Sequence, residues 1–194
     1  MLNYNELKPG KYFILDDHPY LVMEFHFLRM QQRKPVAQTK IKNLITGKTI
    51  EKTFQQTDKF EEADIKTRPI KFLYSNRGEF WFCPEKNPSA RFKLEELLIE
   101  SNGDLMKQDS IVDALVFSHK GKEKIIGVKL PVKIELKVVE APPSTKGNTA
   151  QGGNKQVKLE TGAMINAPLF INEGDIISIN TQSREYVERT EKRQ

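Results

Sequence analysis

The stretch QTKIKNLITGKTIEKTF, residues 38–54, decides the fold. Its first half alternates, with Ile41 on one face and Lys40 and Lys42 on the other, which is the period of a β-strand. Thr46-Gly47-Lys48 has the composition of a turn, and residues 49–54 are rich in β-forming residues. The stretch therefore predicts two antiparallel strands joined by a short turn.

The same pattern of short strands and turns recurs along the whole chain. Even spacing of short strands is typical of small β-barrels. The chain divides into blocks 1–64, 65–129 and 130–194, each of about 65 residues, which is small but viable for a domain. Further strands are expected over residues 11–15, 20–27, 65–74, 79–84, 111–117, 124–130, 133–139, 156–160, 164–170, 175–180 and 185–189.

Two segments depart from the strand pattern. Residues 55–64 are polar and acidic, and we expect them to form a connector. Residues 91–101 show the one helical period, with Phe92, Leu94, Leu97 and Leu98 on a broad face. We expect a helix there, capped by Ser89 and ended by Asn102-Gly103-Asp104.

Composition indicates a globular protein of a reducing compartment. The 194 residues are 38% hydrophobic and carry a formal net charge of +5. The single cysteine, Cys83, excludes an intrachain disulfide. The longest apolar runs, such as 12–15, are far shorter than the roughly 20 residues of a membrane span. We expect a cytoplasmic protein without a membrane partner.

No catalytic or metal-binding pattern stands out. The three histidines, His18, His26 and His119, are far apart, and Cys83 lies in an aromatic strand that favours a buried, inert thiol. Gly47-Lys48-Thr49 resembles the end of a P-loop, but it lacks the earlier glycine and a following helix. We therefore expect no enzyme activity, no metal and no cofactor.

Positive charge is concentrated in residues 29–52, which hold seven basic side chains and one acid, Glu51. A local cluster of this kind is typical of a polyanion-binding surface. The segment 29–35 between the strands contains no Gly, Asn or Asp, which disfavours a tight turn and favours a wider loop. Its cations and amides suit contacts to phosphate and sugar, although a solvated turn is the alternative.

A second candidate loop spans residues 146–154, with the sequence KGNTAQGGN. Its glycines allow the backbone to approach a ligand closely. A strand is expected after it, so a phosphate cradle at a helix start is disfavoured. Loops of this kind bind ligands in oligonucleotide-binding (OB) barrels, and a flexible connecting loop is the alternative.

These motifs resemble bacterial elongation factor P along nearly the whole chain. The matching segments are NLITGKTIEKTF at 43–54, FLY at 72–74 with GEFW at 78–81, KGNTA at 146–150, TGA at 161–163, PLF at 168–170, EG at 173–174 and REYVER at 184–189. The resemblance implies a mainly β fold of three small barrels: an SH3-like (KOW-like) N-terminal barrel over 1–64, then two OB-fold barrels over 65–129 and 130–194. It also implies an overall shape like that of a tRNA.

The resemblance further implies a translation elongation factor. Members of the family bind the ribosome beside the peptidyl-tRNA and stimulate peptide-bond formation when synthesis stalls at consecutive prolines. They do so by positioning reactants, without covalent chemistry of their own. The expected partners are both ribosomal subunits and the peptidyl-tRNA, and we expect a monomer.

The hairpin tip departs from the family, which usually has Pro-Gly-Lys-Gly there, often with a modified lysine. Ungapped alignment puts Met30-Gln31-Gln32-Arg33 at these positions, with Gln32 at the tip. Glutamine cannot carry the lysine or arginine modifications, so we expect an unmodified tip. If the alignment shifts by one, Arg33 becomes the tip and an arginine modification is conceivable. The residues expected to face the tRNA acceptor end are Arg29, Met30, Gln31, Gln32, Arg33 and Lys34, with Lys40 and Lys42 on flanking phosphates.

In the family, the loop of the third domain lies near the exit-site codon. The resemblance carries this role to Lys146, Gly147, Asn148, Thr149, Ala150, Gly152 and Gly153. Tyr186 and Arg189 also match family positions, and they either contact RNA or stabilise the end of the barrel. Two rival functions remain open: a specialised paralogue for other stalling motifs, and a general single-strand-binding module with exposed stacking aromatics.

Overall fold

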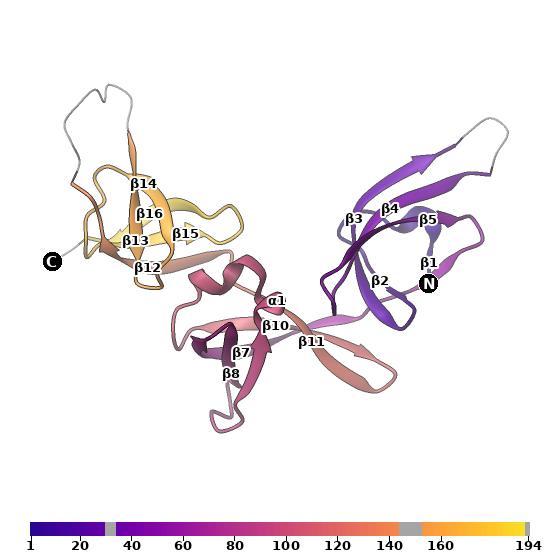
Figure 1. Ribbon diagram of the computed structural model, residues 1–194, viewed down its shortest axis with the longest axis horizontal. Coiled ribbons are helices and arrows are strands. Elements are labelled where there is room, and N and C mark those ends of the chain that lie inside the picture. The colour runs from indigo at the N-terminus through magenta and orange to yellow at the C-terminus, as the bar shows by residue number, and fades with distance from the viewer. Residues whose placement is uncertain (30–33, 144–152, 193–194) are drawn as a thin grey trace. The chain divides into compact units, whose positions relative to one another are not determined.

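The computed structural model describes residues 1–29, 34–143 and 153–192 (Figure 1). Strands dominate and form three sheets, so the predicted mainly β fold is confirmed. No helix in these described ranges is long and apolar enough to cross a bilayer.

The first sheet is six-stranded and antiparallel. In spatial order it contains β1 (Leu2–Asn3), β6 (Lys59–Glu62), β2 (Tyr12–Leu15), β3 (His18–Leu28), β4 (Val36–Asn43) and β5 (Thr49–Gln55). A 3₁₀ turn, η1 (Tyr4–Glu6), follows β1. The core forms around Phe13, which is fully buried and packs edge-on against Phe54 and Phe60. Aromatic pairs of this geometry add about 0.5–1.5 kcal/mol each beyond their buried area.

The expectation of a plain connector over 55–64 is wrong, because the segment contains β6. Phe60, 7% exposed, lies opposite Leu2 of β1, and its ring centroid is 4.7 Å from that of Phe54. The other residues of β6 are exposed to solvent. Burial of the Phe60 side chain therefore determines that this mostly charged segment joins the sheet. Burial of one large side chain contributes about 1.5–3 kcal/mol, which is enough to hold a short strand against polar composition.

The second sheet contains, in order, β11 (Lys122–Lys129), β10 (Ile111–His119), β7 (Ile65–Asn76), β8 (Glu79–Pro84) and β9 (Phe92–Glu95). Phe80 and Phe82 of β8 point into the core, whereas Trp81 between them stacks on Tyr74 with ring centroids 6.0 Å apart. Cys83 is fully buried, in agreement with an inert structural thiol.

The helix predicted over 91–101 is largely wrong. Residues 92–95 form β9, in which Leu94 lies opposite Phe80, and only α1 (Glu96–Ile99) is α-helical before the 3₁₀ segment η2 (Glu100–Leu105). Leu97, expected on the apolar face, is 53% exposed. The strand begins three residues after Ser89, so Ser89 caps no helix, and Asn102-Gly103-Asp104 lies within η2.

Gly103 has a packing role in η2. A Cβ at this position would lie 2.7 Å from Cζ of the buried Phe80 ring. The absence of a side chain therefore allows this turn to pack directly on the aromatic core of the second sheet.

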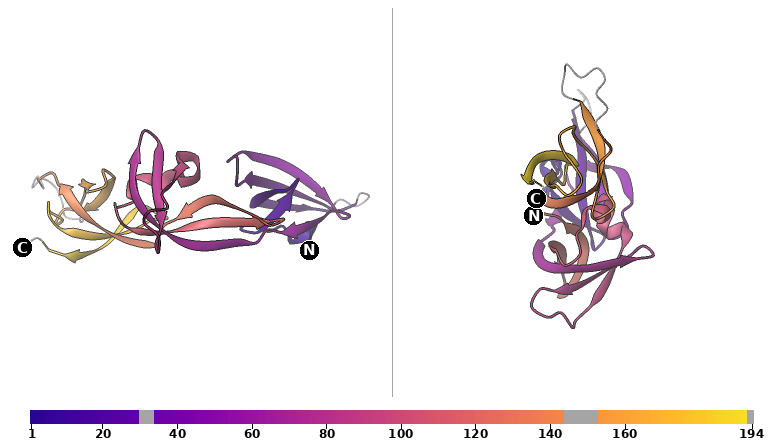
Figure 2. Two further views of the ribbon diagram at one scale, coloured as in Figure 1. Left: turned by 90° about the horizontal axis from the view of Figure 1, so that it is seen from below. Right: turned by 90° about the vertical axis from the view of Figure 1, so that its left-hand side faces the viewer.

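The third sheet contains β14 (Met164–Pro168), β13 (Asn154–Leu159), β12 (Lys133–Glu140), β15 (Ile176–Asn180) and β16 (Glu185–Glu191), in that order. Its edge strands β14 and β16 contact each other, so the sheet curls into a barrel, as Figure 2 shows. Pairs such as Leu136 with Ile177 and Val157 with Ile165 fill its interior.

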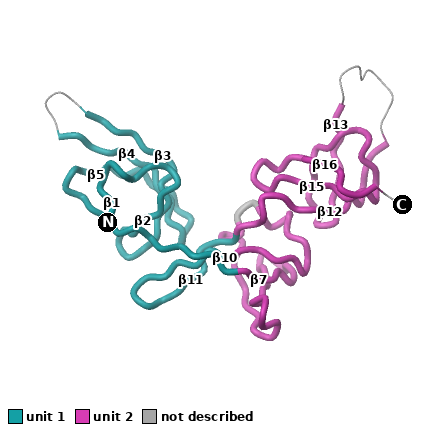
Figure 3. The backbone as a smooth tube through the Cα atoms, turned by 180° about the vertical axis from the view of Figure 1, so that it is seen from behind, with its two compact units in different colours: residues 1–68, 114–128 teal, residues 69–113, 129–194 magenta. Residues whose placement is uncertain are grey.

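The chain forms two compact units, residues 1–68 with 114–128 and residues 69–113 with 129–194 (Figure 3). The strands β7 and β10 each contribute residues to both units. In the first unit, Phe117 and Ile126 form a buried cluster with Ala63 against the apolar edge of the first sheet. In the second unit, Arg184 donates to both carboxylate oxygens of Asp104. The three-domain boundaries at 64 and 129 stay a prediction.

Candidate RNA-binding surfaces

The basic hairpin is built by β3 and β4, with β5 on its other side. The last paired residues are Leu28 and Val36; exposed Arg29 comes directly after β3, and exposed Lys34 lies two residues before the start of β4. These two cations therefore flank the distal end of the hairpin. The predicted tip residues Met30, Gln31, Gln32 and Arg33 lie outside the described residues.

The flanking lysines differ from each other in their surroundings. The ammonium of Lys40 lies 3.1 Å from Oε1 of Glu24, and Glu51 sits directly opposite Lys40 on β5. Lys42 is half-buried between Leu21 and Thr49. Glu24 and Glu51 therefore balance the positive charge in the middle of the hairpin, an arrangement that the number of basic residues in the sequence does not reveal. A phosphate contact by Lys40 or Lys42 stays a prediction.

The described cations without an acidic neighbour lie at the two ends of the hairpin. Within the described ranges, no ion pair joins Arg29, Lys34 or Lys48 to an acid. Lys52 instead lies 5.9 Å from the centroid of the Phe54 ring. Unpaired surface cations interact with an incoming polyanion without first breaking an existing pair. The distal end is therefore the part of the hairpin best suited to phosphate.

The sequence analysis did not identify a row of three polar side chains that crosses the hairpin sheet. His26, Gln38 and Thr53 lie side by side across β3, β4 and β5, one step nearer the tip than Lys40. They line a shallow hollow of 330 Å³ on the outer face of the sheet. The alternation of β4 predicted which face Gln38 occupies, but only the register between strands brings His26 beside it.

The loop predicted to approach the codon connects β12 to β13. Of its candidate residues, Lys146, Gly147, Asn148, Thr149, Ala150 and Gly152 lie outside the described residues. Gly153 is described: its carbonyl accepts a hydrogen bond from the N–H of Leu169 at 3.3 Å, immediately before β13 begins. The base of the loop is thus joined to the end of β14.

Arg189 of β16 makes specific contacts within the third barrel. Its Nη1 atom lies 3.3 Å from Oδ2 of Asp175, whose carboxylate is 1% exposed. The guanidinium also lies 5.3 Å from the centroid of the Phe170 ring. The N–H of Asn172 donates to the same carboxylate oxygen at 2.9 Å. These contacts give Arg189 a structural role, and a contact between Arg189 and RNA stays a prediction. Tyr186, also on β16, is half-buried opposite Ile179.

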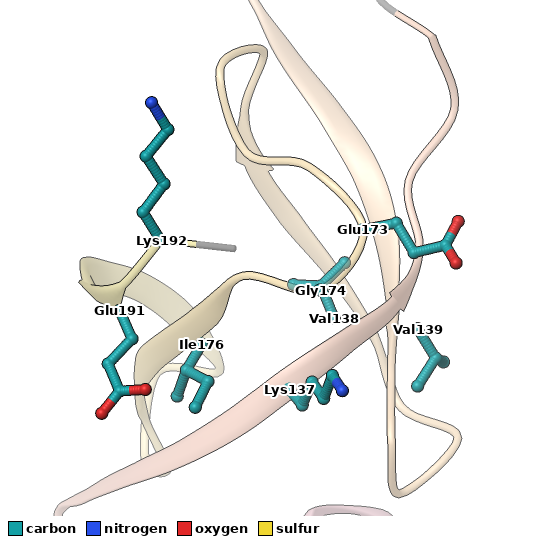
Figure 4. Close-up of a pocket in the computed structure, with 8 residues that line it drawn as sticks. All are labelled: Lys137, Val138, Val139, Glu173, Gly174, Ile176, Glu191 and Lys192. Carbon is teal, nitrogen blue, oxygen red and sulfur yellow. The ribbon is translucent and has the colours of Figure 1, made fainter. Parts of the chain in front are cut away.

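A hollow of 880 Å³ in the third barrel does not have the geometry of a catalytic site. It lies between the end of β12, the turn at Glu173 and Gly174, and the end of β16, as Figure 4 shows. Its carboxylates, Glu173 and Glu191, lie on opposite sides of the hollow. Acid–base pairs and metal sites need such groups to converge on one atom. Among the described residues, no cluster of His, Cys, Asp and Glu is arranged to hold a metal ion.

His119 is partly buried and makes specific contacts. Its side chain is only 14% exposed, stacks on Phe117, and places Nε2 3.2 Å from Oδ1 of Asp17. Lys120 also donates to Asp17, at 2.5 Å. The hydrogen bond from Lys120, and then that from His119, lowers the pKa of the Asp17 carboxyl. This contact joins the turn between β2 and β3 to the turn between β10 and β11 within the first unit.

Comparisons with known proteins identify the family of this chain. Residues 3–60 match the KOW-like domain of elongation factor P, and residues 134–189 match its C-terminal domain. Elongation factor P of Ruminiclostridium cellulolyticum is 38% identical over 189 residues, covering 97% of this chain and 99% of the relative. That of Brachyspira hyodysenteriae is 38% identical over 192 residues, covering 99% and 100%.

A solved structure, the eukaryotic translation initiation factor 5A from Methanococcus jannaschii, aligns with a TM-score of 0.47 at 16% identity. The alignment covers 66% of this chain and 94% of that one, and it is too distant to support an argument. The family assignment therefore depends on the domain matches and on the relatives that align along nearly the whole sequence. Together they show that this chain belongs to the elongation factor P family of translation factors.

Proposed function

We propose that this chain binds the ribosome beside the peptidyl-tRNA and stimulates peptide-bond formation at consecutive-proline stalls, with no covalent chemistry of its own. The observation that carries the proposal is the hairpin formed by β3 and β4, with Arg29 and Lys34 at its distal end, in a chain that belongs to this family. The protein works in the cytoplasm, where it contacts both ribosomal subunits.

The hairpin acts by positioning. In this proposal Arg29, Arg33 and Lys34 bind backbone phosphates near the acceptor end of the peptidyl-tRNA, while unmodified Gln32 faces that end. Holding the reactants in a near-attack geometry lowers an entropic barrier, and well-oriented intramolecular reactions gain up to about 7–11 kcal/mol in this way. A small part of that range is enough to relieve a slow step.

Phosphate-led binding has a measurable salt dependence. About five phosphate contacts predict a log–log slope of ribosome affinity against salt near −3 to −5. The double variant Arg29→Gln/Lys34→Gln removes two contacts, so we expect the slope to become shallower by about 1.5–2. A flat response in the wild-type protein would instead indicate a partner bound through neutral contacts.

The functional test is translation of a proline-stretch reporter in a reconstituted system. We expect Arg29→Gln/Lys34→Gln to lose about tenfold in stimulation at moderate salt, because two phosphate contacts are removed. The double variant Lys122→Gln/Lys124→Gln is the matched control, since both lysines are exposed on β11 and the change in net charge is the same. Equal losses in the two double variants would contradict the role of the hairpin.

The tip is tested separately. Mass spectrometry of the native protein is expected to show no adduct on residues 29–34, and Gln32→Ala is expected to lose stimulation while it keeps ribosome affinity. An adduct, or full activity of Gln32→Ala, would contradict an unmodified glutamine at the acceptor end. Ribosome profiling with and without the protein distinguishes the specialised paralogue, because loss of the ordinary factor deepens stalls at proline codons.

A further inference from the structure

An open hollow of 530 Å³ lies on the third barrel, apart from the basic hairpin. It is bordered by the outer face of β13 and β14 and by the turn that leads into β16. The hairpin of β13 and β14 and the more distant segment around β16 therefore contribute side chains to one place.

Three carboxamides gather on this face. Gln156 of β13 lies directly opposite Asn166 of β14, and Asn154 stands two residues before Gln156 on the same face. Alternation along the strands turns their neighbours Val157 and Ile165 into the core. The three amides are exposed, and none of them makes a side-chain hydrogen bond within the described part of the chain. Their donors and acceptors are thus available to a ligand.

Part of the remaining lining is apolar or aromatic. Tyr186 is half-buried at the wall formed by β16, and Met164, 52% exposed, and Pro168 lie on the opposite wall. The ring of Tyr186 offers a surface on which a planar group can stack, and the thioether and the proline ring add apolar surface to the same hollow. Stacking of a base on an aromatic side chain contributes about 1–3 kcal/mol.

The charges at the hollow disfavour an ionic ligand as the group recognised. Arg184 and Glu185 line it with opposite signs, and the guanidinium of Arg184 is already bound to Asp104. Recognition therefore depends on hydrogen bonds and stacking. A nucleobase has both a π-face and an edge of donors and acceptors.

We propose that this hollow binds an unpaired base of RNA, with adenine preferred, through Gln156 and Asn166 on its edge and Tyr186 on its face. A carboxamide matches adenine because its oxygen accepts from the exocyclic amine while its NH₂ donates to a ring nitrogen. The inference rests on the proposed function, which brings RNA to this protein. A free nucleotide is disfavoured because the one arginine of the lining is engaged by Asp104 and so is not available for a phosphate.

The test is a ¹H–¹⁵N NMR titration of the full chain, which reports directly on side-chain NH₂ groups. The probes are an adenosine hexanucleotide, a uridine hexanucleotide, an RNA duplex of the same length and adenosine monophosphate. We expect the NH₂ signals of Gln156 and Asn166 to shift and saturate with the adenosine hexanucleotide, with a Kd on the order of 1 mM or below. The other three probes are expected to bind more weakly.

Variants of equal size test the roles of the amides. Gln156→Glu and Asn166→Asp exchange an NH₂ donor for an acceptor, and we expect each to weaken binding of the adenosine hexanucleotide by about tenfold. Gln108→Glu is the matched control, because Gln108 is an exposed amide in the turn before β10. Tyr186→Phe should keep the affinity, since stacking needs only the ring, whereas Tyr186→Leu should lose it.

The inference fails if the NH₂ signals stay unmoved at several times that concentration, if the duplex moves them equally, or if Gln108→Glu weakens binding as much as Gln156→Glu. The reporter assay separates this result from the proposed function. Full stimulation at proline stretches with unmoved NH₂ signals overturns the base site alone. Saturable, Gln156-dependent binding without any stimulation supports the base site and overturns the role at proline stalls.

Discussion

Replacement of Arg189 by methionine tests whether its ion pair with Asp175 stabilises the third barrel. Loss of one partner of a buried pair typically costs about 3–5 kcal/mol, because an uncompensated charge stays buried. The carboxylate of Asp175 is 1% exposed, but Arg189 is 28% exposed and the N–H of Asn172 still donates to the carboxylate. We therefore expect the free energy of unfolding to fall by about 2–3 kcal/mol.

The assay is urea unfolding of the full chain followed by far-UV circular dichroism. With a slope of about 2 kcal/mol per molar urea, the midpoint should fall by about 1 M or more. Glu188→Gln is the control on the same strand, because its pair with Lys133 is 3.7 Å long and both side chains are more than half exposed. That change should cost less than about 0.5 kcal/mol.

Equal midpoints for Arg189→Met and Glu188→Gln would refute the reasoning, because the buried carboxylate would then tolerate the loss of its partner. A second variant makes the test sharper. Adding Asp175→Asn to Arg189→Met removes the buried negative charge that has lost its guanidinium, and it should recover part of the lost stability. Further destabilisation by this second change would show that Asp175 depends on contacts other than the guanidinium.

Two further changes test the packing and the charges of the second unit. Gly103→Ala should lower the free energy of unfolding by about 1–3 kcal/mol, measured by thermal unfolding, because the new Cβ would force the buried ring of Phe80 to move. Glu160→Gln tests a carboxylate that accepts from the N–H of Lys137 at 3.0 Å and from Lys107 at 2.9 Å. Burial alone would raise the pKa of Glu160, but these two donors outweigh it and hold the pKa below its ordinary value. The wild-type advantage over Glu160→Gln, about 1 kcal/mol or less, should be complete above the ordinary carboxyl pKa and vanish as the pH falls through the lowered one.

Controls for these two changes lie nearby in the chain. Asn102→Ala alters the same 3₁₀ segment by removing side-chain atoms and adds none, so a loss equal to that of Gly103→Ala would contradict the packing argument. For Glu160, chemical unfolding at a series of pH values is compared with Glu173→Gln. Parallel stability curves for wild type and Glu160→Gln down to the lowest pH would contradict the lowered pKa.

The sequence predicted the strands wherever alternation and turn chemistry agreed. Residues 79–84 form β8 as expected, because Phe80 and Phe82 alternate with Trp81 and a turn precedes them. The pattern failed where few residues decide a strand. Phe60 alone anchors β6. Phe92 and Leu94 fit a period of two, whereas Leu94 with Leu97 and Leu98 fits a helical period, so pairing with β8 decided the outcome.

The candidate sites were predictable as segments but not as charge distributions. The number of basic residues in 29–52 identified a basic hairpin. The ion pair of Lys40 with Glu24, however, depends on the register between β3 and β4, which cannot be derived from the sequence alone. The hollow beside Gln156 and Tyr186 joins residues 30 positions apart, and no local period connects them. Contacts of this range require the fold itself.

The route of the chain through its two compact units constrains how the protein can be dissected. A fragment ending at residue 64 lacks Phe117 and Ile126, so the apolar surface around Ala63 that these side chains cover would face water. Such a fragment would be prone to associate with itself, and its weak behaviour in a binding assay would say little about the hairpin it carries. Expression of the hairpin barrel in isolation therefore needs the β10–β11 segment grafted back onto it.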